Sequence, residues 1–532
     1  MPDIFLHNAR IWTGDETAPW ADAAHVRGGR FVFVGRERDA NPSPDAQRID
    51  ARGRLALPGF IDAHAHLLNT GFAMGSVDLK GVASVAEAVR RVGERAAAAP
   101  ADTWIRGAGW DQHLWPNAAF PHRSALDAAA PEHPVVLNHT SGHCIWVNSA
   151  ALHAAGITRE TPVPSGGAID LDDAGEPSGI LRDTASKLVA DVMPRPAPTE
   201  RVDAMTDAIA HAHSLGVTCA HAMDVGRGEY QALLALRDGG PSREGGRLDL
   251  RVRAYLTAER LDEWFDRAVR TGDGDDLLRI GGVKFFADGA LGSLTAWMRE
   301  PYEGSSGTGL ALQPPEQLET MVRRCLEHGL APAIHAIGDA ANGAVLDIIG
   351  RTRGIAPKLP RRIEHAQLLR EDDVPRFAAL GVTASMQPIH ATQDMAKVDR
   401  FWGERGRWSY AFASLVSTGV NLAFGSDTPV ETMNPIAGIH AAVTRRNGDG
   451  EPSGGWYPEQ RLPLESALRA YTRGAAIAAG EEATLGRIAP GHHADFVILS
   501  HDLFALNDPM RLLESHVDLT CVAGAVVYTR GA

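Results

Sequence analysis

Eight short, mostly apolar segments recur through the chain, and helical-looking stretches separate most of the later ones. Several carry a glycine at their start and a polar residue near their end. They begin near Leu57, Gly216, Leu250, Gly282, Ala331, Arg361, Gly381 and Asn421, and end near His64, Met223, Leu256, Phe286, Ile337, Gln367, Gln387 and Asp427. Eight strands alternating with helices predict an α/β fold, a TIM-like (β/α)8 barrel of residues 57–479. The chemistry of such a barrel takes place at the carboxyl ends of its strands.

Both ends of the chain read as short strands separated by turns. The strand-like stretches are residues 4–12, 23–26, 30–34, 494–499 and 525–528. Neither end carries enough apolar surface to fold alone. We therefore predict one small β-sandwich domain built from both termini, comprising residues 1–56 and 480–532.

One connection is far too long for a barrel crossover, because about 150 residues separate His66 from Gly216. It contains its own strand-like and helix-like stretches. These are residues 103–110 and 134–139 for strands and 84–98 and 200–215 for helices. Since the insertion leaves directly after the first strand, we expect a subdomain of about residues 70–200 that caps the barrel mouth and shapes the substrate site.

The charge balance limits the partners of the chain. The net charge is −14, from 52 Lys and Arg against 66 Asp and Glu, which argues against nucleic acid or an anionic membrane as a partner. Four widely separated cysteines without a C-x-x-C pair predict a reduced protein. The first residues do not resemble a signal peptide, and no apolar run approaches the roughly 18 residues that span a bilayer. We expect a cytoplasmic location.

A His-x-His pair, His64-Ala65-His66, closes the first predicted barrel strand. On a strand, residues i and i+2 point the same way, so both imidazoles can bind one metal ion. Such a pair is weak evidence by itself. The chain contains a second one, His211-Ala212-His213, in a helical stretch, where i and i+2 lie on divergent faces and cannot chelate together.

Four further residues fall near the ends of later predicted strands, namely Lys284, His335, His365 and Asp427. Each histidine alone is more often a hydrogen-bonded core residue than a ligand. Lys284 is harder to explain as structural, because a lysine within a buried apolar strand must lose its charge or find a partner. It is also one of only five lysines among the 52 basic residues. The six groups together predict a site at the barrel mouth.

With these motifs in view, the chain resembles the amidohydrolase superfamily of metal-dependent hydrolases, close to its family 3 branch, which includes N-substituted formamide deformylases. The resemblance extends nearly from end to end. It rests on Pro58-Gly59-Phe60-Ile61-Asp62-Ala63-His64-Ala65-His66, the stretch from Gly142 to Ser149, Val283 to Ser293, Glu364-His365, Gly425-Ser426-Asp427 and Pro490 to Phe496. The motifs are specific only in combination.

The resemblance implies a pair of divalent metal ions, taken as Zn²⁺. The implied ligands are His64, His66 and Asp427 for the more buried ion and His335 and His365 for the more exposed one. Lys284, carrying a carbamate formed with CO₂, would bridge both. Two cations would activate a water and polarise a carbonyl. Asp427 would act as general base and then general acid. The expected reaction is hydrolysis of a non-peptide amide-type C–N bond, as in an N-substituted formamide, N-acyl amine or cyclic amide.

The substrate pocket is the least determined part of the sequence. Candidate contacts are Trp110, Asp111, His143 and Trp146 in the insertion and His221, Asp288 and Trp297 in the barrel. Aromatic residues more often pack a subdomain's own core, and His221 has an equal alternative as a structural histidine. We expect Glu364 to point away from His365 and to support the core. The expected partner is a small-molecule amide, and a homodimer is a possible assembly because relatives commonly form dimers.

Two alternatives remain open. A mononuclear deaminase on the same barrel would activate water with one metal ion and would need no bridging lysine, so Lys284 argues against it. A non-catalytic scaffold protein with this barrel would be expected to have lost several ligands, whereas all six are present.

Overall fold

The computed structural model describes residues 3–100, 103–140, 143–240 and 246–531. The remaining positions lie outside the described residues. They include Gly142 of the motif quoted above and the first two and the last residues of the predicted terminal domain. No helix within the described ranges is long and apolar enough to cross a membrane.

Eight parallel strands form the central sheet, which confirms the predicted barrel. In chain order they are β8 (Phe60–Ala65), β15 (Val217–Val225), β16 (Arg251–Thr257), β17 (Leu278–Phe286), β18 (Pro332–Ala336), β19 (Arg362–His365), β20 (Thr383–Met386) and β21 (Leu422–Phe424). Each strand pairs in parallel with its sequence neighbour in this set. Every predicted strand segment therefore overlaps an observed barrel strand.

The first and last strands of the sheet meet where the predicted ligands lie. The Asp427 N–H donates to the His64 carbonyl at 2.7 Å, and the His66 N–H donates to the Thr428 carbonyl at 3.0 Å. Gly425 makes this approach feasible, because a Cβ at that position would lie 2.4 Å from the His64 nitrogen. Closure of the barrel therefore brings Asp427 beside the histidines of β8.

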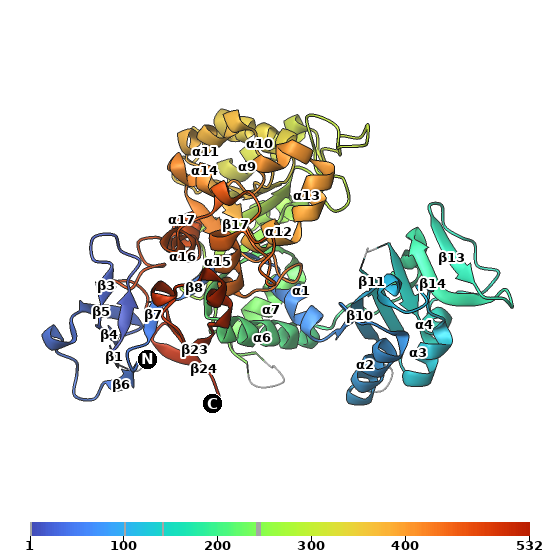
Figure 1. The fold of residues 1–532 in the computed structure, drawn as a ribbon, viewed down its shortest axis with the longest axis horizontal. Coiled ribbons are helices and arrows are strands. Elements are labelled where there is room, and N and C mark those ends of the chain that lie inside the picture. The colour runs from blue at the N-terminus through green and yellow to red at the C-terminus, as the bar shows by residue number, and fades with distance from the viewer. Residues whose placement is uncertain (1–2, 101–102, 141–142, 241–245, 532) are drawn as a thin grey trace. The chain divides into compact units, whose positions relative to one another are not determined.

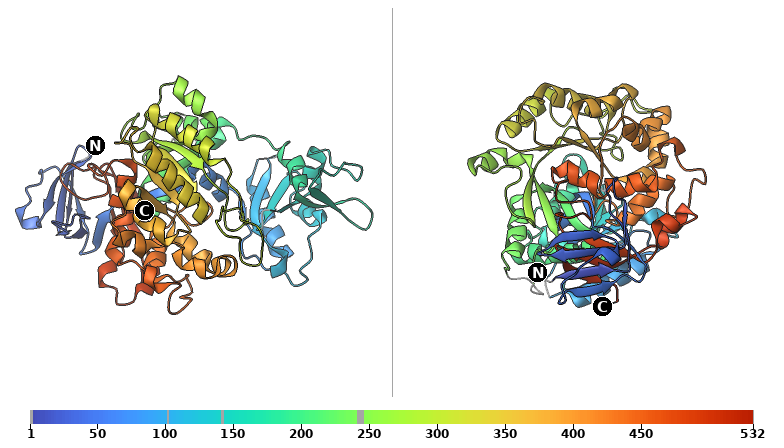
Figure 2. Two further views of the ribbon diagram at one scale, coloured as in Figure 1. Left: turned by 90° about the horizontal axis from the view of Figure 1, so that it is seen from above. Right: turned by 90° about the vertical axis from the view of Figure 1, so that its left-hand side faces the viewer.

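Helices surround the barrel strands, as the right-hand view of Figure 2 shows. The longer ones in the described chain are α6 (Pro198–Ser214), α7 (Arg227–Arg237), α9 (Pro315–Glu327), α10 (Asp339–Thr352), α11 (Val374–Leu380) and α15 (Pro435–Thr444), with α16 (Leu464–Ala470) and α17 (Arg473–Ala479) completing the C-terminal part. The sequence between the later strands reads as helical at residues 316–329 and 372–381, and these stretches form α9 and α11, the latter with a 3-10 turn before it.

The two termini form a β-sandwich, as predicted (Figure 1). One sheet has the order β5-β4-β1-β6 and the other β24-β23-β22-β7-β2-β3. The strand bounds are β1 (Ile4–His7), β2 (Arg10–Trp12), β3 (Trp20–Ala21), β4 (Ala23–Arg27), β5 (Arg30–Gly35), β6 (Gln47–Asp50), β7 (Leu55–Pro58), β22 (Phe496–Leu499), β23 (Val517–Val522) and β24 (Ala525–Thr529). A shared core of residues from both ends, including Ile11, Phe31 and Phe496, confirms that neither terminus is a separate domain.

The predicted segment from Leu57 to His64 contains parts of two strands. β7 belongs to the sandwich and β8 to the barrel, and Gly59 separates them. A side chain at Gly59 would place its Cβ 2.2 Å from Thr218 Oγ1, so only glycine allows the chain to pass from one sheet to the other here.

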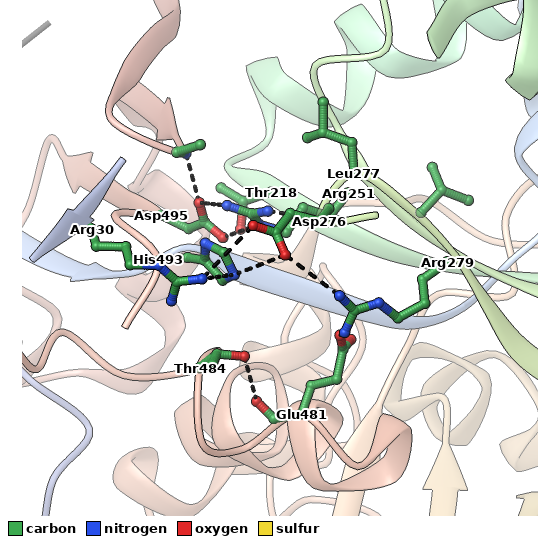
Figure 3. Close-up of polar contacts among 12 residues, drawn as sticks. Arg30, Thr218, Arg251, Asp276, Leu277, Arg279, Glu481, Thr484, His493 and Asp495 are labelled. Atoms are coloured by element: carbon green, nitrogen blue, oxygen red, sulfur yellow. Dashed lines mark hydrogen bonds and ion pairs between the residues drawn. The ribbon is translucent and has the colours of Figure 1, made fainter. Parts of the chain in front are cut away.

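A buried ion network joins the C-terminal segment to the amino ends of the barrel strands (Figure 3). Arg251, the first residue of β16, donates to both oxygens of Asp495 at 2.6 and 3.0 Å. Beside it, Glu481 accepts hydrogen bonds from Arg253 and Arg279. Removing one partner would leave an uncompensated buried charge, so these pairs hold the sandwich against the barrel at the end opposite to the predicted ligands.

The insertion is a separate compact unit, residues Asn69–Ala204. Its six-stranded sheet has the order β13-β14-β12-β11-β10-β9. The strands are β9 (Val77–Asp78), β10 (Ile105–Trp110), β11 (Val135–His139), β12 (Cys144–Val147), β13 (Gly167–Leu171) and β14 (Pro177–Asp183), and the helices within it include α2 (Val85–Ala98), α3 (Arg123–Ala129) and α4 (Ser149–Ala154). Two hydrophobic clusters, one with α2 and α3 and one with α4, give this unit its own core.

Candidate metal centre

Three of the predicted ligands form one compact group. Asp427 Oδ1 lies 3.5 Å from His64 Nε2 and 3.3 Å from His66 Nε2. Within the described ranges, these three residues offer ligand atoms that lie within 4.8 Å of one another. The geometry follows from the strand, because residues 64 and 66 at the end of β8 project on the same side.

Asp427 is held as a carboxylate by its surroundings. Burial would raise its pKa, but a hydrogen bond with His66 and the neighbouring His64, His365 and His390 hold that pKa well below its usual range. Its backbone is in the left-handed region, with φ of 59°, three residues after the end of strand β21. This left-handed conformation directs the Asp427 side chain toward β8. The alternation of side chains along a regular strand therefore does not predict its direction.

Lys284 lies in the same cluster with 1% of its surface exposed. Its Nζ is 3.3 Å from His64 Nε2. Burial lowers the pKa of this amine to about 8, which the nearby carboxylates of Glu364 and Asp427 partly oppose. A neutral primary amine is therefore accessible near physiological pH, and only that form can react with CO₂.

His335 and His365 complete the predicted set, with ring centroids 4.6 Å apart. His335 Nε2 donates to the Gly289 carbonyl at 2.9 Å, and His365 Nδ1 pairs with Gln387 Oε1 at 2.8 Å. Each contact orients one ring nitrogen and leaves the other as a potential ligand atom. Burial lowers the pKa of His335 to about 3 and that of His365 well below its usual value, so both imidazoles are neutral.

Glu364 contacts the site directly, which corrects the expectation that it points away from His365 toward the core. Glu364 Oε2 lies 2.6 Å from His64 Nδ1, and neither side chain is exposed. Strand alternation failed as a guide because His365 and Ala366 have φ angles of 69° and 42°, so the strand ends in left-handed backbone. Glu364 thereby fixes the proton on His64 Nδ1 and leaves Nε2 available.

Arg362 occupies the middle of the barrel and holds Glu364 in place. Its guanidinium donates to both Glu364 oxygens, to the Ala63 carbonyl at 2.5 Å and to Ser385 Oγ at 2.7 Å. It also lies 2.8 Å from His221 Nδ1, which accepts a hydrogen bond from it. The structure therefore places His221, a candidate substrate contact, in this buried network with 1% of its surface exposed.

Asp62 is another buried residue that sequence reasoning missed. It accepts the His64 N–H at 3.1 Å and both the N–H and hydroxyl of Ser426 at 3.0 and 2.6 Å. Burial raises the pKa of Asp62 to about 6. This residue fastens β8 to the segment that carries Asp427, and its position two residues before His64 was the available sequence clue.

A cavity of about 390 Å³ opens above the cluster. Its lining contains all six predicted ligands. The other lining residues are Phe286, Ala290, Leu291, Gly292, Ile337, Gln367, His390, Gln393, Asp394, Lys397, Val430 and Glu431. His390, which the sequence did not single out, forms a second group of potential ligand atoms with His365 and Asp427 among the described residues. The donor set therefore fits divalent metal ions.

The candidate substrate contacts in the insertion lie in different settings. Trp110 and Trp146 have none of their surface exposed and belong to the hydrophobic core of this unit. Asp111 accepts a hydrogen bond from the backbone of the short helix that follows it. His143 is exposed and lies 2.9 Å from Asp183. We therefore leave the two buried tryptophans out of the proposed pocket.

The two remaining candidates lie on the loop after β17. Asp288 is fully buried and accepts the backbone N–H groups of Trp297, Ile337 and Gly338 at 2.8–3.0 Å. Burial raises the pKa of Asp288 to about 7. Neither Asp288 nor Trp297 is among the described residues that line the cavity. Asp288 thus ties this loop to the end of β18.

A (β/α)8 barrel with this donor set at its strand ends defines the class of metal-dependent hydrolases that act on C–N bonds. The model of the amidohydrolase family matches residues 47–528, so the chain belongs to that family.

The relatives agree with this assignment. The amidohydrolase family protein YtcJ of Bacillus subtilis is 33% identical, covering 98% of this chain and 99% of its own length. N-substituted formamide deformylase of Arthrobacter pascens is 28% identical, covering 94% of each chain. An uncharacterized metal-dependent hydrolase from Pyrococcus furiosus matches with a TM-score of 0.78 and 31% identity, covering 94% of this chain and 99% of that chain.

Proposed function

We propose that this enzyme is a binuclear zinc hydrolase that cleaves a non-peptide amide-type C–N bond in a small molecule. The observation that carries the proposal is the gathering of the six predicted ligands, which are four histidines, one lysine and one aspartate, around a single cavity at the carboxyl ends of the barrel strands. A solvated or purely structural role would not require so many imidazoles to face one cavity.

The donor types match the preference of Zn²⁺ for imidazole nitrogen and carboxylate oxygen. The proposed ligands are His64, His66 and Asp427 for one ion and His335 and His365 for the other, with Lys284 shared. Bound ions would supply Lewis acidity that activates water and polarises a carbonyl.

Lys284 would contribute as a carbamate. Its neutral amine adds CO₂ and releases one proton, which converts a buried base into an anion with two oxygen donors. The lowered pKa of about 8 keeps part of the amine in the reactive form. Arginine could not serve here, because a guanidinium stays protonated and does not add CO₂.

Asp427 would move the proton. Because its pKa is held well below the usual range, it is a carboxylate at neutral pH and can accept a proton from the attacking water. It would then pass that proton to the departing amine. Glu364 and Gln387 keep His64 and His365 in fixed tautomers meanwhile.

The cavity lining favours a neutral or apolar amide. Phe286, Leu291, Ile337 and Val430 provide apolar surface beside the ligands. The relative named N-substituted formamide deformylase supports the same class. We propose N-substituted formamides, N-acyl amines or cyclic amides as substrates. The four buried, unpaired cysteines support a reducing cytoplasmic setting.

The test is the metal content of protein purified with bicarbonate and Zn²⁺, together with hydrolysis of a panel of these amides. We expect two zinc ions per chain and release of an amine from at least one amide class. A firm ratio of one, with Lys284→Ala still active, would favour instead the mononuclear deaminase, for which the compact group of His64, His66 and Asp427 would suffice.

A further inference from the structure

His390 lies on α12 (Pro388–Gln393), the short helix that directly follows the seventh barrel strand β20. Its side chain is 13% exposed and it lines the cavity. The Nε2 atom is buried and has no hydrogen-bond partner among the described residues. A buried ring nitrogen without a partner loses its hydration with no compensation, so it indicates a ligand that the protein chain itself does not supply.

Two other potential ligand atoms lie within reach of this nitrogen. His390 Nε2 is 3.7 Å from Asp427 Oδ2, too far for a hydrogen bond but suitable for two atoms that share a metal ion. The ring of His390 is nearly parallel to that of His365, with 9° between the planes and 6.2 Å between the centroids. The ligand atoms of His365, His390 and Asp427 all lie within 4.8 Å of one another.

The carboxylate of Asp427 stands between two sets of histidines. Its Oδ1 is the oxygen near His64 and His66, whereas its Oδ2 is the oxygen near His390. Gln387 engages His365 Nδ1, which leaves His365 Nε2 as its ligand atom. The second set therefore offers two nitrogens and one oxygen, which are donor types that Zn²⁺ binds.

An unpartnered histidine nitrogen is not sufficient by itself. His213 Nε2 also lacks a hydrogen-bond partner among the described residues, and Asp249, whose side chain is half exposed, lies 3.7 Å from it. Among the described residues, no third metal-binding side chain joins that pair in a ligand group. His390 differs because two further donors converge with it on one point of the cavity.

We propose that His390 is a ligand of the second, more exposed zinc ion, together with His365. This assignment rests on the proposed binuclear function and adds a residue of α12 to the set that the strand ends provide. It does not replace His335, whose Nδ1 remains available when Nε2 is bonded to Gly289.

The experiment compares the zinc content of wild-type, His390→Ala and Gln393→Ala proteins purified with Zn²⁺ and bicarbonate. Gln393 is the matched control, because it lies three residues further along the same helix and lines the same cavity. We expect two ions per chain in the wild type and in Gln393→Ala, and one in His390→Ala. Calorimetric titration of the metal-free proteins should show that only the second ion binds at least about 10-fold more weakly in His390→Ala, with the first unchanged.

A cysteine variant tests ligation directly and does not depend on loss of binding. In His390→Cys loaded with Co²⁺, we expect a thiolate-to-cobalt charge-transfer band that the wild-type protein lacks. The four native cysteines are buried and serve as the internal background. If His390→Ala does not fold, this variant decides the assignment.

The outcomes separate the two proposals. Two ions of unchanged affinity in His390→Ala, or no new band in folded, cobalt-loaded His390→Cys, would overturn the role of His390 and leave the binuclear enzyme intact. A single ion in the wild type would overturn the binuclear function and the His390 assignment together.

Discussion

The chain contains the tripeptide His-Ala-His twice, at residues 64–66 and 211–213, and the structure places the two copies in opposite situations. In the first copy the Nε2 atoms of His64 and His66 lie 3.5 and 3.3 Å from Asp427 Oδ1. In the second copy, on α6, His213 lies 3.7 Å from the half-exposed Asp249, and neither histidine joins a ligand group within the described ranges.

The difference comes from the backbone rather than from the residues. A strand repeats every two residues and presents both imidazoles to one space, whereas a helix turns by about 100° per residue and separates them. The strand copy is also surrounded by groups from the ends of four other strands, because the barrel gathers all its carboxyl ends in one place. No comparable set of strand ends converges around a helix on the outside of the barrel.

The largest effect on metal binding and activity is expected when the two histidines of the strand copy are replaced, whereas replacing those of the helix copy should have none. His64→Asn with His66→Asn should lose metal binding and reduce activity by at least roughly 100-fold, since even indirect partners of metal ligands contribute 10- to 100-fold. Metal analysis and amide hydrolysis provide the measurement. His211→Asn with His213→Asn is the matched control and should retain zinc. Equal loss in both double variants would contradict the distinction.

Lys284→Arg should be nearly as damaging, although it exchanges one basic residue for another. Arginine cannot form a carbamate, so we expect loss of the second metal ion and of most activity. The check is zinc content with and without added bicarbonate, which should respond to bicarbonate only in the wild type. The surface lysine Lys187, paired with Asp191, offers the control substitution Lys187→Arg, for which no change is expected.

The carboxylates beside the two copies provide a third comparison. Glu364→Gln should weaken zinc binding by about 10- to 100-fold, because His64 would lose the acceptor that fixes its tautomer. It should also lower the free energy of unfolding by about 3–5 kcal/mol, since Arg362 would keep a buried charge without its partner. Zinc titration and denaturant unfolding measure the two effects.

Asp249→Asn is the corresponding change beside His213. The Asp249 side chain is half exposed and burial lowers the pKa of its neighbour His213, so this contact contributes at most about 0–1 kcal/mol and neither zinc affinity nor stability should change measurably. A comparable loss of zinc affinity in this variant would show that the effect of Glu364→Gln is not specific to the metal centre.

The smallest expected effect concerns protonation in the metal-free protein. Burial first, and then the neighbouring Lys284, lower the pKa of His64 to about 4. Lys284→Met removes the cation and should raise that pKa toward 6.5. The pKa of His211, lowered by burial alone, should stay constant. Nuclear magnetic resonance titration of the imidazole protons between pH 3 and 8 would measure both.

The same titration has a stability consequence with a definite sign. A histidine whose folded pKa lies below its unfolded value costs stability as the pH falls from about 6.5 toward the folded pKa, because the unfolded chain takes up the proton first. Lys284→Met should therefore reduce the contribution of His64 to acid destabilisation. A larger His64 contribution in that variant would contradict the assigned cause.

Sequence periodicity predicted most of the architecture. Eight apolar segments were enough to indicate the barrel, and strand ends carrying His, Lys and Asp indicated where the site lies. Periodicity failed at Glu364, because left-handed backbone at His365 breaks the strand alternation. It also gave no reason to choose His390, which lies on a helix after a strand end. Asp62 precedes His64 by two residues on the same strand, but its contact with Ser426 spans 364 residues and no local pattern indicates it.

The sequence by itself determined the residue types, their order and the local periodicity, and with these the fold class and the six strand-end groups. Only the tertiary structure decided which groups meet. Closure of β8 against β21 brings Asp427 to His64, and the packing of Arg362 inside the barrel fixes Glu364 against the same ring. The physical reason is that a barrel converts sequence separations of hundreds of residues into contacts of a few ångströms, and no local pattern encodes those distances.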